Sequence, residues 1–447
     1  MERDLVVFVP GITGSILYRA DGTPIWRRSL WTVARGLASL PQTLAELTLP
    51  YGIGDEEPEP ARRLAAQGLI HSWHAWPGVH TGAGYDGLEK LLRRMDPAAT
   101  RIFAYDWRLS NRFTARRLGR QVNEWLDGWR HESGDSTAKV TFICHSMGGL
   151  IVRYLLEVLG AREIARKVVT LGTPFSGSLK AVASLTGDAY SRVPRYGGAI
   201  TETARSFPSL YQLLPTYRCI DGGAEPMSLA DYPIAALNDA GRRDGAAFHA
   251  EISAAVTRNG PAPYQLNVLV GKRHDTLQSV QIVSSERRRY LRVQRGTDHS
   301  GDGTVATFAA VPPEWHDSAA ATMVAVRHGQ LTSDAWSLET LAEKLSPIEL
   351  GAVLVPDVEL GIGLPDIAFA AEGIPIEASA SRDDLLLHAA VMAPNSAEIV
   401  SEAEVPPLGD GRYATTITAP VGVWRVEVKA VTEQPQISTS DIVWVVE

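Results

Sequence analysis

The stretch of sequence that decides the fold reads Val140-Thr141-Phe142-Ile143-Cys144-His145-Ser146-Met147-Gly148-Gly149-Leu150. Its first half is an apolar run typical of a buried parallel strand, and its second half opens a helix. Ser146 lies at the sharp turn between the two. A nucleophile elbow has this form, because a strained turn lifts the serine hydroxyl above the edge of the sheet. We therefore predict that Ser146 is a nucleophile.

The elbow needs small residues two positions before and two positions after the serine, because strand and helix nearly touch there. Gly148 meets this need, whereas Cys144 stands where a glycine is usual. Cysteine is small without being minimal, and the flanking strand and helix are complete, so we keep the interpretation. His145 is predicted to be structural and to point away from the nucleophile. An ordinary serine in a strand–helix turn is the alternative.

Further apolar runs predict the rest of a sheet. They are Leu5–Val9, Arg101–Tyr105, Val168–Leu171, Leu266–Val270 and Thr322–Val326. Helical spacing of apolar residues separates these runs, most clearly between Phe113 and Trp129. Strands that alternate with helices predict a mostly parallel central sheet with helices on both faces. Together with the serine turn, this pattern is typical of the α/β-hydrolase fold.

Two long stretches interrupt this alternation, near residues 20–80 and 180–262. Insertions at the strand ends of such a sheet often cover a site, so both are predicted to form a lid. From residue 351 onward, short alternating strands replace the helical period. We predict an α/β-hydrolase domain over residues 1–350 and an immunoglobulin-like β-sandwich over residues 351–447.

The charges divide at the same place. Residues 351–447 hold 15 acidic and 4 basic side chains, within a net charge of −8 for all 447 residues. This balance argues against a nucleic-acid binder. Basic runs such as Arg287–Arg289 allow two interpretations, either peripheral contact with an anionic membrane or plain solvated faces.

Cysteine content and hydropathy indicate the compartment. The two cysteines, Cys144 and Cys219, give no disulfide framework. No apolar run reaches the length of a membrane span or of a signal-peptide core. We expect a cytoplasmic protein.

A serine hydroxyl at neutral pH needs an imidazole to take its proton and a carboxylate to fix that imidazole's tautomer. In this fold the order along the chain is serine, acid, histidine. The histidines that follow Ser146 are His249, His274, His299, His316, His328 and His388. His328 is the predicted base, because it directly follows the apolar strand Thr322–Val326, where the fold places this residue.

The segment Asp298-His299-Ser300-Gly301-Asp302-Gly303-Thr304-Val305 supplies the predicted acid. Glycines on both sides of Asp302 allow a tight turn that aims the carboxylate into the site. A supporting hydrogen bond is expected from Thr304. Asp298 and Asp275 are the alternatives, and a plain Gly-Asp-Gly turn is the simplest explanation of the segment.

Acyl transfer builds negative charge on a carbonyl oxygen, and two backbone N–H groups must be aimed at it. We predict one donor at Met147, directly after the nucleophile. The other is predicted at Ile12 in the glycine-rich loop after the first strand, with Thr13 as the alternative. This chemistry needs no cofactor and no metal. His71, His74 and His80 imitate a metal set and are predicted to be loop residues.

These residues belong to a wider pattern, and the chain resembles the lecithin:cholesterol acyltransferase and lysosomal phospholipase A2 family of lipases over roughly residues 5–345. The matching pieces are Val9-Pro10-Gly11 with Gly14, Pro77-Gly78, Ala104-Tyr105-Asp106-Trp107-Arg108-Leu109, His145-Ser146-Met147-Gly148, Leu171-Gly172-Thr173-Pro174-Phe175-Ser176-Gly177-Ser178, Gly301-Asp302-Gly303-Thr304-Val305 and His328. The resemblance implies a triad of Ser146, Asp302 and His328, oxyanion donors at Ile12 and Met147, and lipid esters as substrates. The family's early cysteine pair and secretion signal are absent, and the β-sandwich is an addition.

We therefore predict a serine lipase or phospholipase that hydrolyses or transfers acyl groups of glycerophospholipids or related lipid esters. Tryptophans in the first insertion favour a membrane-facing lid. A cytoplasmic phospholipase endangers its own membrane, so a gated membrane-attacking effector, with the sandwich docking a regulatory protein, is a further interpretation. The alternatives are a small-ester or polyester hydrolase and a catalytically silent binding protein.

Overall fold

The computed structural model describes residues 4–27, 40–71, 74–76, 80–82, 84–193, 195–222, 225–315, 320–346, 358–433 and 437–447. Six strands form one sheet in the order β14-β11-β9-β8-β1-β7, and every neighbouring pair is parallel. Their bounds are β1 Leu5–Val9, β7 Thr100–Ile102, β8 Val140–His145, β9 Ala165–Leu171, β11 Gln265–Gly271 and β14 Thr322–Val324. The chain leaves β1 toward one edge for β7 and then returns to the other side for β8. Such a reversal opens a crevice at the carboxyl ends of the strands.

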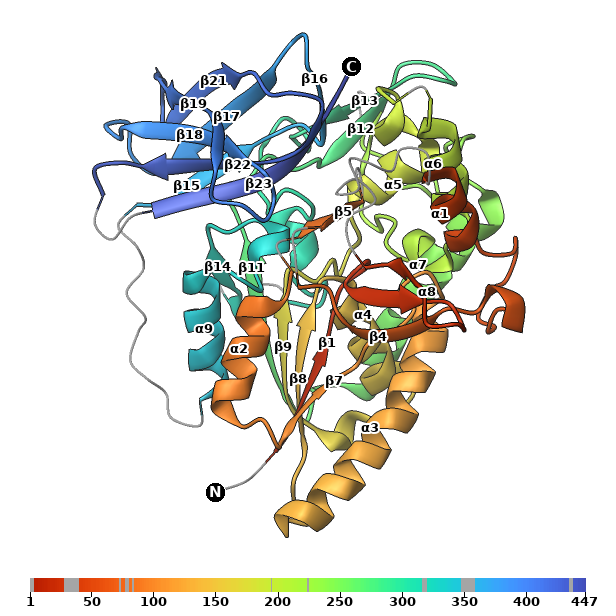
Figure 1. The fold of residues 1–447 in the computed structure, drawn as a ribbon. Coiled ribbons are helices and arrows are strands. Elements are labelled where there is room, and N and C mark those ends of the chain that lie inside the picture. The colour runs from red at the N-terminus through yellow and green to blue at the C-terminus, as the bar shows by residue number, and fades with distance from the viewer. Residues whose placement is uncertain are drawn as a thin grey trace.

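Helices cover both faces of this sheet (Figure 1). One face carries α2 (Asp86–Met95) and α9 (Ala335–Leu345), and the other carries α3 (Asn111–Ser133) and α4 (Met147–Arg153). Side chains alternate between the two faces with period two. Val7 and Phe142 pack with the α3 side, while Phe8 and Ile143 pack with the α2 side. The predicted α/β-hydrolase fold is confirmed.

Two of the predicted strands end earlier than expected, and one helix changes its type. Strand β7 ends at Ile102 rather than Tyr105, because the chain turns inward and the Tyr105 hydroxyl donates to the Pro10 carbonyl oxygen at 2.7 Å. Strand β14 likewise ends at Val324 rather than Val326. The helix after Ser146 changes to a π-helical turn over Tyr154–Val158.

Both insertions lie at the carboxyl edge of the sheet, in the upper right of Figure 1. The first contains β2 (Ser15–Tyr18), β3 (Pro24–Trp26), α1 (Leu40–Leu47), β4 (Ala65–Leu69), β5 (His74–Trp76) and β6 (His80–Gly82). The second contains α5 (Leu179–Thr186), α6 (Gly197–Arg205), α7 (Pro208–Tyr211), β10 (Ile220–Asp221) and α8 (Asp239–Asn259). A hydrogen bond of 3.0 Å between the hydroxyls of Thr48 and Thr203 joins the two insertions.

The prediction of a membrane-facing lid that contains tryptophans is tested only in part. Trp26 is fully buried and donates its indole N–H to the Thr13 carbonyl oxygen at 2.8 Å, so it belongs to the core. Trp31 and Trp73 lie outside the described residues.

The basic run 287–289 is not simply solvated, because Arg288, on β13 (Arg288–Leu291), pairs with Asp188 at 2.5 Å. β13 and β12 (Ser279–Ile282) form a hairpin that was not predicted.

The C-terminal part is a β-sandwich of two sheets. One sheet contains β15 (Leu360–Gly363), β17 (Ile374–Ala380), β21 (Arg412–Ile417) and β20 (Pro407–Gly409). The other contains β16 (Ile367–Phe369), β23 (Ile437–Val446), β22 (Gly422–Ala430), β18 (Leu387–Met392) and β19 (Ile399–Val405). Alternate residues such as Ile376 and Val428 fill a core between the sheets. The predicted boundary at residues 350 and 351 lies outside the described residues.

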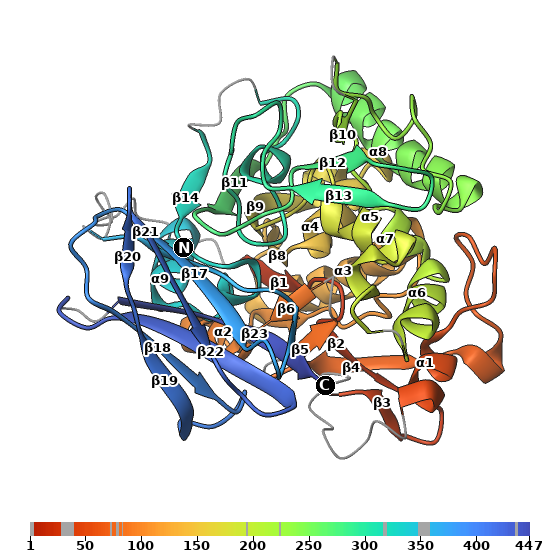
Figure 2. The same cartoon turned by 90° about the horizontal axis from the view of Figure 1, so that it is seen from above.

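The sandwich packs against the carboxyl edge of the central sheet, as the view from above shows (Figure 2). Ile442 and Trp444 of β23 join the same hydrophobic cluster as the core of the α/β body. The sequence alone gave no sign of this shared core. Within the described residues, no helix has the length and apolar character needed to cross a membrane.

Candidate active site

Ser146 occupies a strained turn between β8 and α4. Its φ is 53° and its ψ is −127°, a conformation that L-residues rarely adopt. A Cβ atom added at Gly148 would lie 2.4 Å from the Val9 carbonyl oxygen, so only glycine fits where helix and strand meet. Cys144 is fully buried, and burial raises the pKa of its thiol. The turn therefore has the geometry predicted from the sequence.

His328 lies between Ser146 and Asp302. Its Nε2 is 2.8 Å from the Ser146 Oγ, and its Nδ1 is 2.7 Å from the Asp302 Oδ2. An ionised carboxylate only accepts hydrogen bonds, so Nδ1 carries the proton and Nε2 accepts from the serine hydroxyl. The exposed fractions of these residues are 4% for Ser146, 2% for His328 and 1% for Asp302. The structure thus brings the three predicted residues together in one buried chain of hydrogen bonds.

Backbone groups hold the Asp302 carboxylate in place. Its Oδ1 accepts from the N–H groups of Thr304 at 2.9 Å and Val305 at 2.7 Å. Gly303 has a φ of 89°, which favours glycine at this position. The expected support from Thr304 therefore comes from its backbone amide. The carbonyl oxygen of Asp302 also accepts from the N–H of His328 at 2.8 Å, which ties the two loops together.

The alternative acids bind elsewhere. Asp298 accepts from the Gln278 side-chain amide at 2.6 Å, and Asp275 pairs with Arg292 at 2.7 Å. His299 packs edge-on against Phe308. The imidazoles of two further alternatives have other partners: His274 Nδ1 lies 3.1 Å from the Ile362 backbone nitrogen, and His249 Nε2 lies 2.9 Å from the Gln212 carbonyl oxygen. His388 lies on β18 of the sandwich, and His316 lies outside the described residues.

The glycine-rich loop after β1 passes directly over the nucleophile. A Cβ atom at Gly11 would lie 2.9 Å from the Cβ of Ser146. Ile12 lines the small space at Ser146 together with His328. Met147 opens α4, and the first N–H groups of a helix have no acceptor within that helix. Both predicted oxyanion donors therefore border the serine. Thr13 is the residue predicted as the alternative donor, and its carbonyl oxygen accepts a hydrogen bond from the Trp26 indole.

A hydrogen-bonded chain through Tyr85 and His145 was not predicted. The Tyr85 hydroxyl accepts from the Gly11 N–H at 3.0 Å and lies 2.9 Å from the His145 Nδ1. The His145 Nε2 lies 3.0 Å from the carbonyl oxygen of His328. Because that carbonyl only accepts, His145 carries its proton on Nε2 and accepts at Nδ1 from the tyrosine hydroxyl. His145 therefore joins the loop of Gly11 to the loop of His328, beyond the general structural role expected of it.

We expect Tyr85→Phe to destabilise the protein by about 1–3 kcal/mol, because the Gly11 N–H and the His145 Nδ1 would be left buried without their partner. Urea unfolding of the variant and the wild type measures this difference. Tyr232→Phe is the control, because Tyr232 is exposed. An unchanged midpoint for Tyr85→Phe would contradict the assigned hydrogen bonds.

Two of the other histidines are buried in neutral form. Burial lowers the pKa of His249 to about 4 and that of His274 to about 3. The His249 Nε2 is 2.9 Å from the Gln212 carbonyl oxygen. As pH falls from the ordinary pKa of 6.5 toward these values, only the unfolded state takes up the protons. The free energy of unfolding therefore decreases as the pH falls through this window. Above the window, the stabilising contribution of the two neutral histidines is fully present.

Between pH 7 and pH 5, we expect the free energy of unfolding of His249→Gln to fall by about 2 kcal/mol less than that of the wild type. The variant lacks one group whose protonation favours the unfolded state. The glutamine amide retains a donor for the Gln212 carbonyl oxygen. Urea unfolding at both pH values gives the comparison, and the exposed His131 provides the control variant His131→Gln. Parallel pH curves for His249→Gln and the wild type would show that the imidazole is not buried in neutral form.

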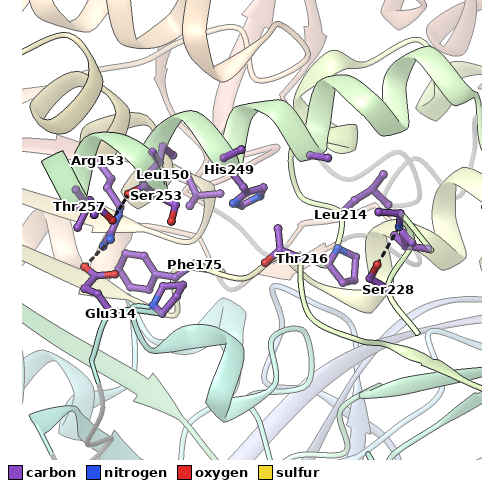
Figure 3. Close-up of a pocket in the computed structure, with 18 of the residues that line it drawn as sticks. Leu150, Arg153, Phe175, Leu214, Thr216, Ser228, His249, Ser253, Thr257 and Glu314 are labelled. Carbon is purple, nitrogen blue, oxygen red and sulfur yellow. Dashed lines mark hydrogen bonds and ion pairs between the residues drawn. The ribbon is translucent and has the colours of Figure 1, made fainter. Parts of the chain in front are cut away.

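The space at Ser146 is small, while a larger cavity lies close by. The former measures about 20 Å³, which is room for about one water molecule. The latter measures about 560 Å³ and lies between α4 and α8, where Arg153 pairs with Glu314 at 2.5 Å (Figure 3). Phe175 and Leu214 line this cavity, and their chain neighbours Pro174 and Leu213 line the space at Ser146. Neighbouring residues of the same two segments therefore line the two spaces.

Of the three histidines that imitate a metal set, the structure describes the side chain of His71 alone. The His71 Nδ1 lies 2.8 Å from a carboxylate oxygen of Asp86. The side chains of His74 and His80 lie outside the description. Among the described residues, no group of three or more His, Cys, Asp or Glu side chains is placed to hold a metal ion.

Comparisons with known proteins give a family and two relatives. Residues 95–238 match the family model of lecithin:cholesterol acyltransferase. The chain is 27% identical over 203 residues to phospholipase A(1) LCAT3 of Arabidopsis thaliana, which covers 40% of this chain and 42% of the plant protein. It is 27% identical over 178 residues to the uncharacterized protein YJR098C of Saccharomyces cerevisiae, which covers 39% of this chain and 23% of the yeast protein. The matches thus span less than half the length of either relative.

A solved structure adds a distant likeness. A chain of the Tle4–Tli4 complex is 17% identical, with a TM-score of 0.48, and the alignment covers 76% of this chain and 97% of that chain. The resemblance predicted from the sequence motifs is confirmed by the family match over residues 95–238.

Proposed function

From a chain that combines a lecithin:cholesterol acyltransferase-like segment with an α/β-hydrolase sheet, we propose a serine hydrolase that cleaves acyl esters of lipids. The observation that carries the proposal is the hydrogen-bonded chain from Ser146 through His328 to Asp302. Phospholipase and lipase chemistry is supported at the level of the family. Glycerophospholipids are the preferred substrate class, and transfer to an alcohol is the variant of the second step.

In the first step, the Ser146 Oγ attacks the acyl carbonyl carbon while its proton moves to the His328 Nε2. The carbonyl oxygen becomes an oxyanion, which the N–H groups of Ile12 and Met147 stabilise. The C–O bond to the alcohol then breaks, and the alcohol oxygen takes the proton from His328. Asp302 keeps the imidazole in the productive tautomer throughout.

In the second step, water attacks the acyl-enzyme and gives its proton to His328. Collapse of the new tetrahedral intermediate breaks the bond to the Ser146 Oγ, which recovers its proton, and a fatty acid leaves. An alcohol in place of water produces a new ester by the same atoms and bonds. The acyl-enzyme therefore serves hydrolysis and transfer alike.

The small space at Ser146 supports a gated enzyme. About 20 Å³ holds no acyl chain, so α5 and the segment around Leu213 must move before an ester reaches the nucleophile. Such opening is a common property of lids over water-excluding sites. A membrane-attacking role, a regulatory protein on the acidic sandwich and a cytoplasmic location all stay predictions.

Labelling with a fluorophosphonate tests the proposal directly, because phosphonylation needs both the serine and its base. We expect one labelled peptide, containing Ser146, and we expect the untreated protein to release fatty acid and lysolipid from phospholipid vesicles. Mass spectrometry reads both products, and the phosphonylated protein is the control. No labelling would support the silent binding protein. Labelling with hydrolysis of short esters alone would support the small-ester hydrolase.

A further inference from the structure

The C-terminal sandwich contacts the chain on both sides of His328. Arg327, one residue before the base, forms an ion pair with Asp441 of β23 and donates from Nη1 to the Ile362 carbonyl oxygen of β15 at 2.7 Å. Gln330, two residues after it, donates to the Ser440 hydroxyl at 2.9 Å. Arg327 and Asp441 are 5% and 3% exposed, so their charges compensate each other away from water.

The same arginine touches the loop of the acid. A Cβ atom added at Gly303 would lie 2.9 Å from the Arg327 Nη2, so the guanidinium rests on the residue that follows Asp302. Gly303 itself donates its N–H to the Thr276 hydroxyl at 2.8 Å. The Arg327 side chain is thus confined between the sandwich and the acid loop.

His274 forms a second connection between the sandwich and the acid loop. Its Nδ1 accepts from the Ile362 N–H at 3.1 Å, and its own backbone N–H donates to the Gly301 carbonyl oxygen at 2.9 Å. A neutral imidazole is able to accept this bond, and burial keeps His274 neutral. Ile362 is therefore bound by two side chains of the α/β body, which come from different loops of the site.

We propose that the sandwich positions the catalytic base and acid, with Arg327 as the main positioning residue. The proposal rests on the assigned roles of His328 and Asp302. An arginine bound at two points on β15 and β23 cannot shift without moving the adjacent His328, since one peptide unit joins them. The His328 N–H bond to the Asp302 carbonyl oxygen then carries the restraint into the acid loop.

Two substitutions in the full-length chain test this role. Arg327→Gln removes the guanidinium that contacts both Ile362 and Asp441, and Asp441→Asn keeps the shape of the partner while removing its charge. We expect kcat for a soluble ester to fall about 10- to 100-fold with KM within about twofold, because the reacting groups are misplaced while the substrate contacts stay. The double variant is expected to lose little more than either single variant, as residues of one network do.

Arg292→Gln is the matched control. Arg292 also connects the body to the sandwich, through Glu377 at 2.7 Å, and its partner in the body is Asp275, also at 2.7 Å, rather than a residue of the His328 or Asp302 loop. It is 52% exposed. A role limited to holding the two parts together predicts similar effects for Arg292→Gln and Arg327→Gln, whereas the positioning role predicts a loss of kcat only for the latter.

Hydrogen–deuterium exchange supplies a readout that does not depend on activity. We expect faster exchange in peptides covering residues 300–306 and 326–332 of Arg327→Gln and Asp441→Asn, and unchanged exchange there in Arg292→Gln. Arg327→Lys, which keeps the charge, should recover part of the protection and part of kcat. A wild type without esterase activity would overturn the proposed function, yet the exchange comparison would still decide the positioning role.

Wild-type exchange and wild-type kcat in both test variants would overturn the inference. Equal losses in all three variants would also overturn it, because the sandwich would then act only as general support. Asn has the same shape as Asp, so Asp441→Asn still tests the inference if Arg327→Gln fails to fold.

Discussion

Ser146→Ala is expected to lower kcat for ester hydrolysis by about 10⁶, to the level left by the oxyanion donors and binding alone. The hydroxyl is the only atom group removed, and its partner, the His328 Nε2, remains next to water when the site opens. The measurement is the initial rate of fatty-acid release, with the unfolding midpoint taken on the same samples. Ser191→Ala, at an exposed position, provides the control.

The fold should survive this change. Alanine accommodates the turn at position 146 no better than serine, so the strain at φ 53° is retained and the stability should change little. Loss of activity together with an unchanged midpoint would assign the effect to chemistry. Residual hydrolysis within tenfold of the wild type would show that another group attacks the ester.

Asp302→Asn is expected to lower kcat by about 10⁴. The N–H groups of Thr304 and Val305 would hold the new amide by its oxygen, which turns the NH2 group toward the His328 Nδ1. That nitrogen must then accept, so the proton moves to Nε2. A histidine protonated at Nε2 cannot take the proton of the Ser146 hydroxyl.

Asp298→Asn is the matched control, because Asp298 is the alternative acid in the same segment and binds Gln278 instead. We expect its kcat to stay within about threefold of the wild type, as for a change remote from the reacting groups. Steady-state rates from pH 5 to pH 9 make the comparison. A larger loss in Asp298→Asn than in Asp302→Asn would reverse the assignment of the acid.

Local sequence patterns were sufficient to predict the central sheet and the serine turn. The apolar run before Ser146 and the glycine at 148 both reflect contacts within a few residues of the chain, so they are visible in one dimension. His328 and Asp302 were predicted because the fold fixes their order and because each follows a recognisable strand or turn. The ends of β7 and β14 were predicted too far along the chain. Tyr105 and Val326 are buried beyond these strands, and in the sequence such residues resemble strand residues.

Contacts between distant segments were not predictable in this way. Tyr85 and His145 are ordinary residues in the sequence, and only the packed structure puts them in line with the loops of Gly11 and His328. The same holds for Arg327, whose partner Asp441 belongs to a separate sheet. Patterns of hydropathy and spacing carry no information on which surfaces of two such units meet.

The ion pair between Arg327 and Asp441 also bears on biosynthesis. A ribosome adds Asp441 long after His328, and domains generally fold in order as the chain emerges. With Arg327 in its proposed role, the base and acid loops of a nascent chain stay loose until β23 has been translated and has docked. A chain under synthesis, or one truncated by a ribosome that stops early, is then a poor catalyst. Translation itself would then delay the onset of the proposed ester cleavage until β23 has docked.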